Sequence, residues 1–179
     1  MKLVNTSCCL QMEKSALIEL STGSYGSILV QPRRMRKFVL LTPVALHALC
    51  AAQTLLPAEI QLVLTRGYEP VTMILRLSRW IGRLLFTLLY PLRAREAGAI
   101  FHHNGHGCDG NHIDVSIRLN KQPLQLLPFS VFTPLFLIEK CEFNHATALA
   151  RVRSALQSEG FVIHQNRVEA LQIHCDLTR

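Results

Sequence analysis

Residues 101–115 read FHHNGHGCDGNHIDV, and they hold four of the eight histidines of the chain together with two aspartates, a cysteine and three glycines. Glycine lets the backbone turn tightly, so imidazole and carboxylate groups can converge on one point. A catalytic zinc site needs three nitrogen or oxygen ligands and one open position. The stretch therefore predicts a metal site made from a loop histidine, a strand aspartate and a histidine of a distant strand. The alternative is a polar loop that binds metal only adventitiously.

The residues on both sides of this stretch predict a single α+β domain. Residues 112–117 alternate in polarity as a half-buried strand does, and a small antiparallel sheet with helices packed on one side is expected. Residues 1–34 carry little pattern, with a turn or loop at 21–27, and residues 35–179 form the predicted domain. The other expected elements are helices at 42–55, 71–90 and 145–158, and strands at 60–65, 161–163 and 170–175.

The composition excludes a disordered chain, because 49% of the 179 residues are hydrophobic and only 17% are charged. The net charge of +7 favours an acidic partner such as a membrane surface or an anionic wall polymer. No aromatic residues are interleaved with the basic clusters, so no nucleic-acid partner is expected. The six cysteines form no CxxC motif, which argues against a zinc ribbon or a thioredoxin motif.

Two apolar segments raise the question of a membrane. Residues 38–56 carry no formal charge and are long enough to span a bilayer; a buried core helix, an unusual export signal and a membrane span are the three interpretations. No signal peptide is evident at the N-terminus as written. Residues 71–90 are amphipathic, with arginines along one side. This second segment is either a surface helix that lies on the core or a helix that docks on an anionic surface.

The order of the motifs resembles that of the D-alanyl-D-alanine carboxypeptidase and dipeptidase family of zinc peptidases, which includes the vancomycin-resistance enzymes. The family shares its fold with murein endopeptidases and the hedgehog amino-terminal domain. Residues 106–114 resemble its His-x(6)-Asp motif, and residues 62–70 resemble its strand followed by Ser-Gly-Tyr-Arg-Pro. Residues 148–161 resemble its last helix, which ends in Gly-Phe, and residues 169–174 stand where it has Glu-x-x-His. The resemblance covers about residues 40–178.

The resemblance implies a zinc site with named roles. His106, Asp114 and His174 would be the metal ligands, Glu169 the general base, and Arg66 the group that binds the oxyanion of the substrate. The sequence departs from the family in three places: residues 106 and 114 are one position too far apart, residues 169 and 174 are five apart instead of three, and Glu69 replaces the family arginine. His112 is the alternative to His106, and Asp176 is the alternative base.

The expected function is therefore that of a bacterial zinc metallopeptidase that hydrolyses peptidoglycan stem peptides at or near D-amino acids. It would act as a monomer in the periplasm or cell wall, and the helix at 71–90 would contact an anionic surface. Two alternatives stay open: a catalytically silent metal-binding or interaction domain on the same fold, and a basic membrane-associated protein. A cysteine nucleophile at Cys108 is a weaker alternative, because no helix amino-terminus is expected there to lower the pKa of its thiol.

Overall fold

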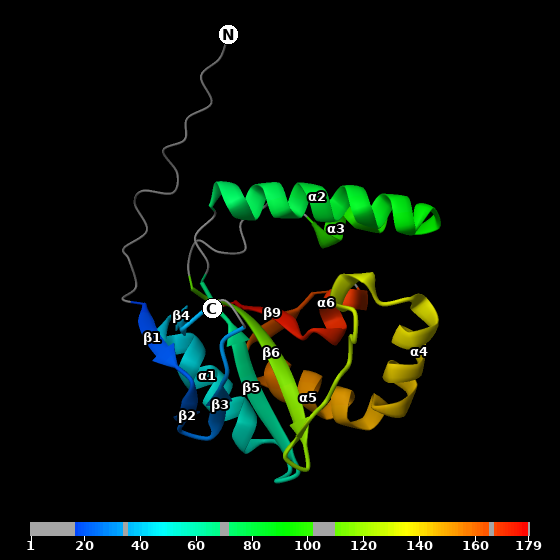
Figure 1. The fold of residues 1–179 in the computed structure, drawn as a ribbon. Coiled ribbons are helices and arrows are strands. Elements are labelled where there is room, and N and C mark those ends of the chain that lie inside the picture. The colour runs from blue at the N-terminus through cyan, green and yellow to red at the C-terminus, as the bar shows by residue number, and fades with distance from the viewer. Residues whose placement is uncertain (1–16, 34–35, 69–71, 102–109, 165–166, 179) are drawn as a thin grey trace.

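The computed structural model describes residues 17–33, 36–68, 72–101, 110–164 and 167–178. Its main sheet is mixed and has the strand order β2-β3-β5-β6-β9-β8 (Figure 1). The neighbouring strands on this path are antiparallel except β3 and β5, which run parallel. The strands on this path are β2 (Gly23–Tyr25), β3 (Ile28–Val30), β5 (Ile60–Arg66), β6 (His112–Leu119), β8 (Phe161–Ile163) and β9 (His174–Leu177). The short strand β7 (Gln122–Pro123) lies off this path and pairs with β6. A separate two-stranded sheet joins β1 (Ile18–Ser21) to β4 (Phe38–Leu41).

One face of the main sheet carries the hydrophobic core. Helices α1 (Pro43–Thr54) and α5 (Ala146–Ser158) contact each other and cover this face (Figure 1). Alternate residues of the central strands point into the same core, among them Ile113, Val115 and Ile117 of β6. The remaining helical segments are α2 (Met73–Leu89), η2 (Pro91–Arg93), α3 (Glu96–Ile100), η3 (Ser130–Phe132), α4 (Leu135–Asn144) and α6 (Arg167–Leu171).

The uncharged run at 38–56 folds as strand β4 followed by helix α1. Thr42 caps α1 by accepting a hydrogen bond from the backbone N–H of Ala45, and Pro43 occupies the first turn, where its missing N–H costs nothing. One side of α1 is fully buried, which agrees with the prediction of a core helix. In the part of the chain that the structure describes, no helix has the length and apolar character needed to cross a bilayer.

Thr42 also fixes the start of β6. Its N–H donates to the carbonyl of Gly110 at 3.0 Å, and its hydroxyl donates to Oδ1 of Asn111 at 2.8 Å. Gly110 has φ +75, and a Cβ there would lie 2.3 Å from the Leu17 side chain. Glycine is therefore required at this turn, which leads the chain directly into His112.

Most predicted elements are present, with two differences. The predicted helices at 42–55, 71–90 and 145–158 and the strands at 60–65, 112–117 and 161–163 are confirmed within one or two residues. The strand predicted at 170–175 is wrong over its first part, because α6 continues to Leu171 and the backbone then turns through Ile173 at φ 49 before β9 begins. The segment 1–34, which carries little sequence pattern, contributes β1, β2 and β3, and the predicted loop at 21–27 includes β2.

Residues 71–90 were expected to form either a surface helix that lies on the core or a helix that docks on an anionic surface, and little of α2 is buried against the core. Of its described side chains only that of Phe86 is buried, and its ring packs against Tyr90, Phe101 and Phe132. Gly82 allows the same contact, since a Cβ there would lie 2.7 Å from the Phe101 ring. The wide apolar face of α2 is instead exposed.

Candidate metal centre

The pairing of β6 with β9 gathers four polar side chains on one face of the sheet. Register places His112 opposite Asp176 and Asp114 opposite His174. Side chains alternate along a strand, so these four share the face opposite to Ile113 and Cys175, which are fully buried in the core. Asp114 and His174 thus lie on adjacent antiparallel strands, as the sequence predicts.

A third histidine reaches the group from the end of β8. The backbone N–H of His164 donates to the carbonyl of His174 at 3.0 Å, which continues the pairing of β8 with β9 by one residue. The ring centroid of His174 lies 3.9 Å from that of His112 and 4.5 Å from that of His164. Three imidazoles from three strand segments therefore meet at one end of the sheet.

These three histidines are arranged closely enough to hold a metal ion. One ring nitrogen from each of His112, His164 and His174 lies within 4.8 Å of the others. Two nitrogens bound to one tetrahedral zinc lie about 3.3 Å apart, because each bond is about 2 Å long. The nitrogens would therefore have to approach one another by up to about 1.5 Å to bind one ion. Three imidazoles suit zinc, copper, iron or nickel, so the donor set does not identify the metal.

Two carboxylates fix the orientation of the three rings. Nδ1 of His112 donates to Asp176 Oδ1 at 2.5 Å, and Nε2 of His164 donates to Asp176 Oδ2 at 3.0 Å. Nδ1 of His174 donates to Asp114 Oδ1. Metal coordination would use the other nitrogen of each ring. Histidine ligands of metals regularly have such carboxylate partners, which set the tautomer and raise the basicity of the ligand.

Both carboxylates stay ionised at neutral pH. Burial alone would raise the pKa of Asp114, but the hydrogen bond from His174 and the charges of His174, Arg33 and Arg66 outweigh burial and lower it. Burial also acts to raise the pKa of Asp176, and the hydrogen bonds from His112 and His164 outweigh it in the same way. The cluster therefore has two acceptor carboxylates for its three imidazole N–H groups.

The thiol next to this cluster does not contribute a ligand or nucleophile. Cys175 lies between His174 and Asp176, but its side chain points to the core face and is buried. Burial, followed by the charges of Asp114 and Asp176, raises the pKa of this thiol far above neutrality. A protonated, buried thiol is chemically inert.

Two arginines border the site beside Asp114. Arg33 Nη2 lies 3.0 Å and Arg66 Nη1 lies 3.6 Å from Asp114 Oδ2. The Arg33 and Arg66 side chains are 45% and 31% exposed, so both guanidinium groups face solvent as well as the carboxylate. Arg66, predicted to bind the substrate oxyanion, lies at the site next to Asp114. Arg33 was not predicted as a site residue, because only the parallel pairing of β3 with β5 brings it there.

The structure describes only part of the predicted site. His106 lies outside the described residues, and Glu69 does too. The backbone of Glu169 lies in α6, but its side chain is outside the described part. His112, the alternative ligand, belongs to the histidine cluster. His164 also belongs to it, but its spacing in the sequence did not predict that it would be a ligand.

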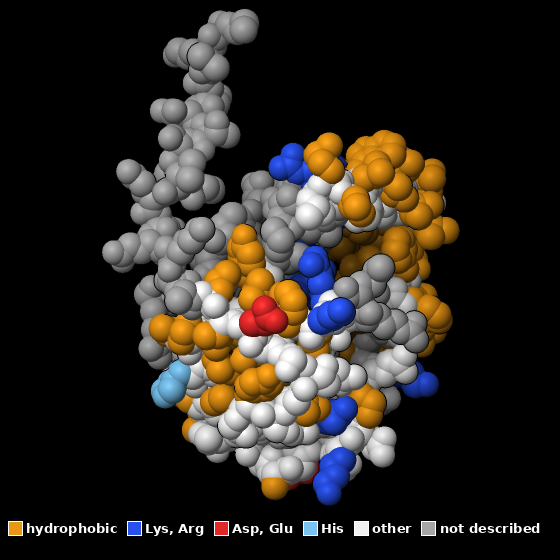
Figure 2. Space-filling model, turned by 60° about the vertical axis from the view of Figure 1, so that its left-hand side comes forward, with side chains coloured by type: hydrophobic (Ala, Val, Ile, Leu, Met, Phe, Trp, Pro, Cys, Tyr) orange, Lys and Arg blue, Asp and Glu red, His pale blue; other side chains and the backbone are white. Residues whose placement is uncertain are grey.

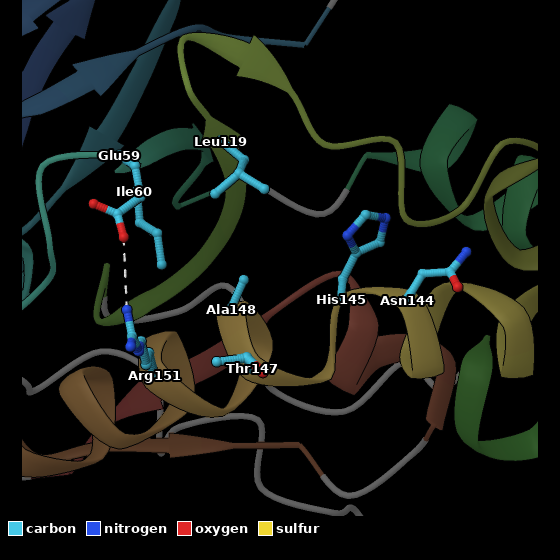
Figure 3. Close-up of a pocket in the computed structure, with 8 residues that line it drawn as sticks. All are labelled: Glu59, Ile60, Leu119, Asn144, His145, Thr147, Ala148 and Arg151. Carbon is cyan, nitrogen blue, oxygen red and sulfur yellow. Dashed lines mark ion pairs between the residues drawn. The ribbon is translucent and has the colours of Figure 1, made fainter.

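A shallow pocket lies at the opposite end of β6 (Figure 3). Ile60 and Leu119, which pair where β5 begins and β6 ends, form one wall, and the start of α5 forms the other. Glu59 and Arg151 face each other across it, with 3.6 Å between Oε1 and Nη1. His145 is the one histidine among its lining residues. The pocket is separate from the histidine cluster and lacks a comparable group of ligands.

The comparisons with known proteins add no relative. No family model matches the sequence, and neither the curated proteins nor the solved structures gave a match. The interpretation of the site therefore depends on its own geometry: three histidines that lie close enough to bind a metal ion.

Proposed function

We propose that the protein is a zinc-dependent hydrolase and that His112, His164 and His174 hold the metal. The observation that carries the proposal is the convergence of these three imidazoles, each hydrogen-bonded to a carboxylate. Three neutral nitrogen ligands with a fourth position open to water are the donor set of a catalytic zinc site, whereas structural zinc sites use four protein ligands. A zinc ion bound there would supply Lewis acidity, which lowers the pKa of bound water and polarises a carbonyl group.

The residues around the cluster would orient the histidine ligands and supply the general base. Asp114 and Asp176 hold the histidine rings in place and keep one nitrogen of each ring directed away from the carboxylates. Glu169, in the helix that precedes β9, is the proposed base that takes a proton from the attacking water and passes it to the leaving amine. Asp176, whose side chain is 37% exposed, is the alternative base.

The two arginines fit a peptide substrate with a free carboxylate. Guanidinium groups bind carboxylates in a bidentate geometry, and Arg33 and Arg66 present partly exposed guanidinium groups at the edge of the site. The resemblance to the D-alanyl-D-alanine peptidases points to the same substrate end, because those enzymes act at the terminus of a stem peptide. We therefore propose that the substrate is a peptidoglycan stem peptide, cut at or near a D-amino acid.

The test combines metal analysis with a hydrolysis assay. The purified protein should contain one zinc per chain, and it should release D-alanine from peptides ending in D-alanyl-D-alanine or cleave isolated sacculi. A chelator should abolish the activity and added zinc should restore it. Bound metal without hydrolysis of either substrate would indicate a metal-binding domain and would overturn the proposed activity. Absence of bound metal would overturn both the proposed metal site and the proposed activity.

Variants distinguish the two candidate ligand sets. His164→Ala should lose the metal, because His164 supplies one of the three converging nitrogens. His106→Ala should keep it. The reverse result would favour the ligand set that the family resemblance implies, which is His106, Asp114 and His174. His145→Ala is the matched control, since this histidine lines the distant pocket and not the cluster.

A further inference from the structure

Helix α2 exposes a wide and continuous apolar face. Side chains of 42% to 81% exposure cover it, and among the side chains of α2 that the structure describes only that of Phe86, on the other side of the helix, is buried. Figure 2 shows hydrophobic side chains gathered over the upper part of the molecule, where Figure 1 places α2. The exposed apolar residues of α2 are Met73, Ile74, Leu77, Trp80, Ile81, Leu84, Leu85, Leu88 and Leu89. Single exposed apolar residues are normal on a protein surface, but a contiguous patch of this kind marks an interaction site.

The charge on α2 is positive along one edge of that face. Arg76, Arg79 and Arg83 are spaced by three and four positions, so they lie on one side of the helix, and the sequence of α2 contains no acidic residue. Arg76 and Arg83 are exposed, whereas Arg79, on the same side of the helix as Phe86, is half-buried. Trp80 follows Arg76 by four positions and precedes Arg83 by three, so it lies beside both arginines at the border of the apolar face. The surface therefore passes from leucines, through the tryptophan, to arginines.

This order matches the layers at the surface of an anionic bilayer. Leucine and isoleucine side chains enter the acyl region, a tryptophan sits at the headgroup level, and arginines pair with lipid phosphates. A protein partner would have to bring acidic groups to one edge of an apolar groove, whereas an anionic membrane supplies both environments at any position. The net charge of +7 adds long-range attraction to such a surface.

We propose that α2 docks the protein on membranes that contain anionic lipids, with the helix lying in the plane of the interface. Phe86 and its aromatic neighbours join the helix to the domain on the side opposite to the apolar face, so this face can enter the bilayer without unfolding the core. This interaction does not depend on the metal centre, since the histidine cluster is built from β6, β8 and β9.

Trp80 makes the test specific, because it is the single tryptophan of the chain. Vesicles of phosphatidylcholine with phosphatidylglycerol should shift the emission of the full-length protein to the blue, and a brominated phosphatidylcholine should quench it. Vesicles of phosphatidylcholine alone should bind far less protein in a flotation assay. The double variant R76Q/R83Q should partition about 25-fold less into the anionic vesicles, because each arginine near such a surface contributes about fivefold.

The controls separate this proposal from its rivals. K121Q/K140Q removes two positive charges outside α2 and should bind nearly as well as the parent protein. Leu84→Gln should lose most of the blue shift while the protein stays folded, since this side chain is 48% exposed. Equal partition of R76Q/R83Q and the parent, or no change in Trp80 emission with anionic vesicles, would overturn the proposal. The proposal would also fail if the protein without lipid has the mass of a dimer and the emission of Trp80 is already shifted to the blue. The apolar face of α2 would then bind a second copy of the chain.

Discussion

The two carboxylates of the histidine cluster should respond to mutation in opposite ways. Asp176 contacts two of the three histidines, at 2.5 and 3.0 Å, whereas Asp114 contacts only His174 among them. Removing one such carboxylate costs a metal site about 10- to 100-fold in affinity. We therefore expect Asp176→Asn to weaken zinc binding by about 100-fold and Asp114→Asn by about 10-fold.

In the metal-free protein, Asp114→Asn should lower the free energy of unfolding more than Asp176→Asn does. Asp114 is fully buried and pairs with Arg33, Arg66 and His174, so its loss leaves charges without their partner. Because both arginines can regain water, we expect the lower end of the usual range, about 3 kcal/mol. The Asp176 side chain is 37% exposed and solvent screens its hydrogen bonds, so Asp176→Asn should cost about 1 kcal/mol.

Two titrations measure these effects separately. Competition with a chromophoric chelator gives the zinc affinity, and urea unfolding in the presence of a chelator gives the free energy of unfolding. Glu19→Gln is the control, because this carboxylate is exposed on β1 and should change the stability by under about 0.5 kcal/mol. If Asp176→Asn binds zinc as tightly as the parent protein, the assignment of His112 and His164 as ligands is wrong.

Three other outcomes follow from the structure. The pKa values of Asp114 and Asp176 are lowered in the folded protein, so their contribution to stability is present above about pH 5 and is lost as the pH falls through those folded pKa values. Acid titration followed by circular dichroism should therefore show unfolding, and Asp114→Asn should make that transition less steep. Gly67→Ala should destabilise the fold by at least about 2 kcal/mol in urea unfolding, because its Cβ would lie 2.2 Å from the Leu40 carbonyl oxygen. Leu49→Ala, in the buried face of α1, should cost about 2–5 kcal/mol in the same measurement, and a smaller loss would mean that the core collapses around the missing side chain.

Local patterns predicted the longer elements, because their information lies within one segment. Polar alternation identified the central strand β6, and a core helix, which α1 matches, was one of the three interpretations of the uncharged run at 38–56. Strands β1, β2 and β3 have three or four residues each, too few for a recognisable period, and they are stabilised by partners elsewhere in the chain. Similarly, residues 170–175 have the composition of a strand, but the turn at Ile173 depends on packing that the segment itself does not encode.

The sequence predicted the pairing of the two strands that carry Asp114 and His174, and it missed the segments that bring other residues beside them. Asp114 and His174 were paired correctly, because the order of motifs implied neighbouring strands. His164 reaches the cluster only through the pairing of β8 with β9, and Arg33 only through that of β3 with β5. In α2 the amphipathic period was correct, but a period cannot tell which side of a helix meets the core.

The position of β9 has a consequence for folding kinetics. This strand lies between β6 and β8, and the contact that joins His174 to Asp114 spans 60 residues of chain. Contacts of such long sequence separation form late, because the entropy of closing the intervening chain must be overcome first. Interactions absent from the transition state change the unfolding rate and leave the folding rate almost untouched. A metal ion held by this cluster would thus prolong the lifetime of the folded chain without helping the chain to reach it.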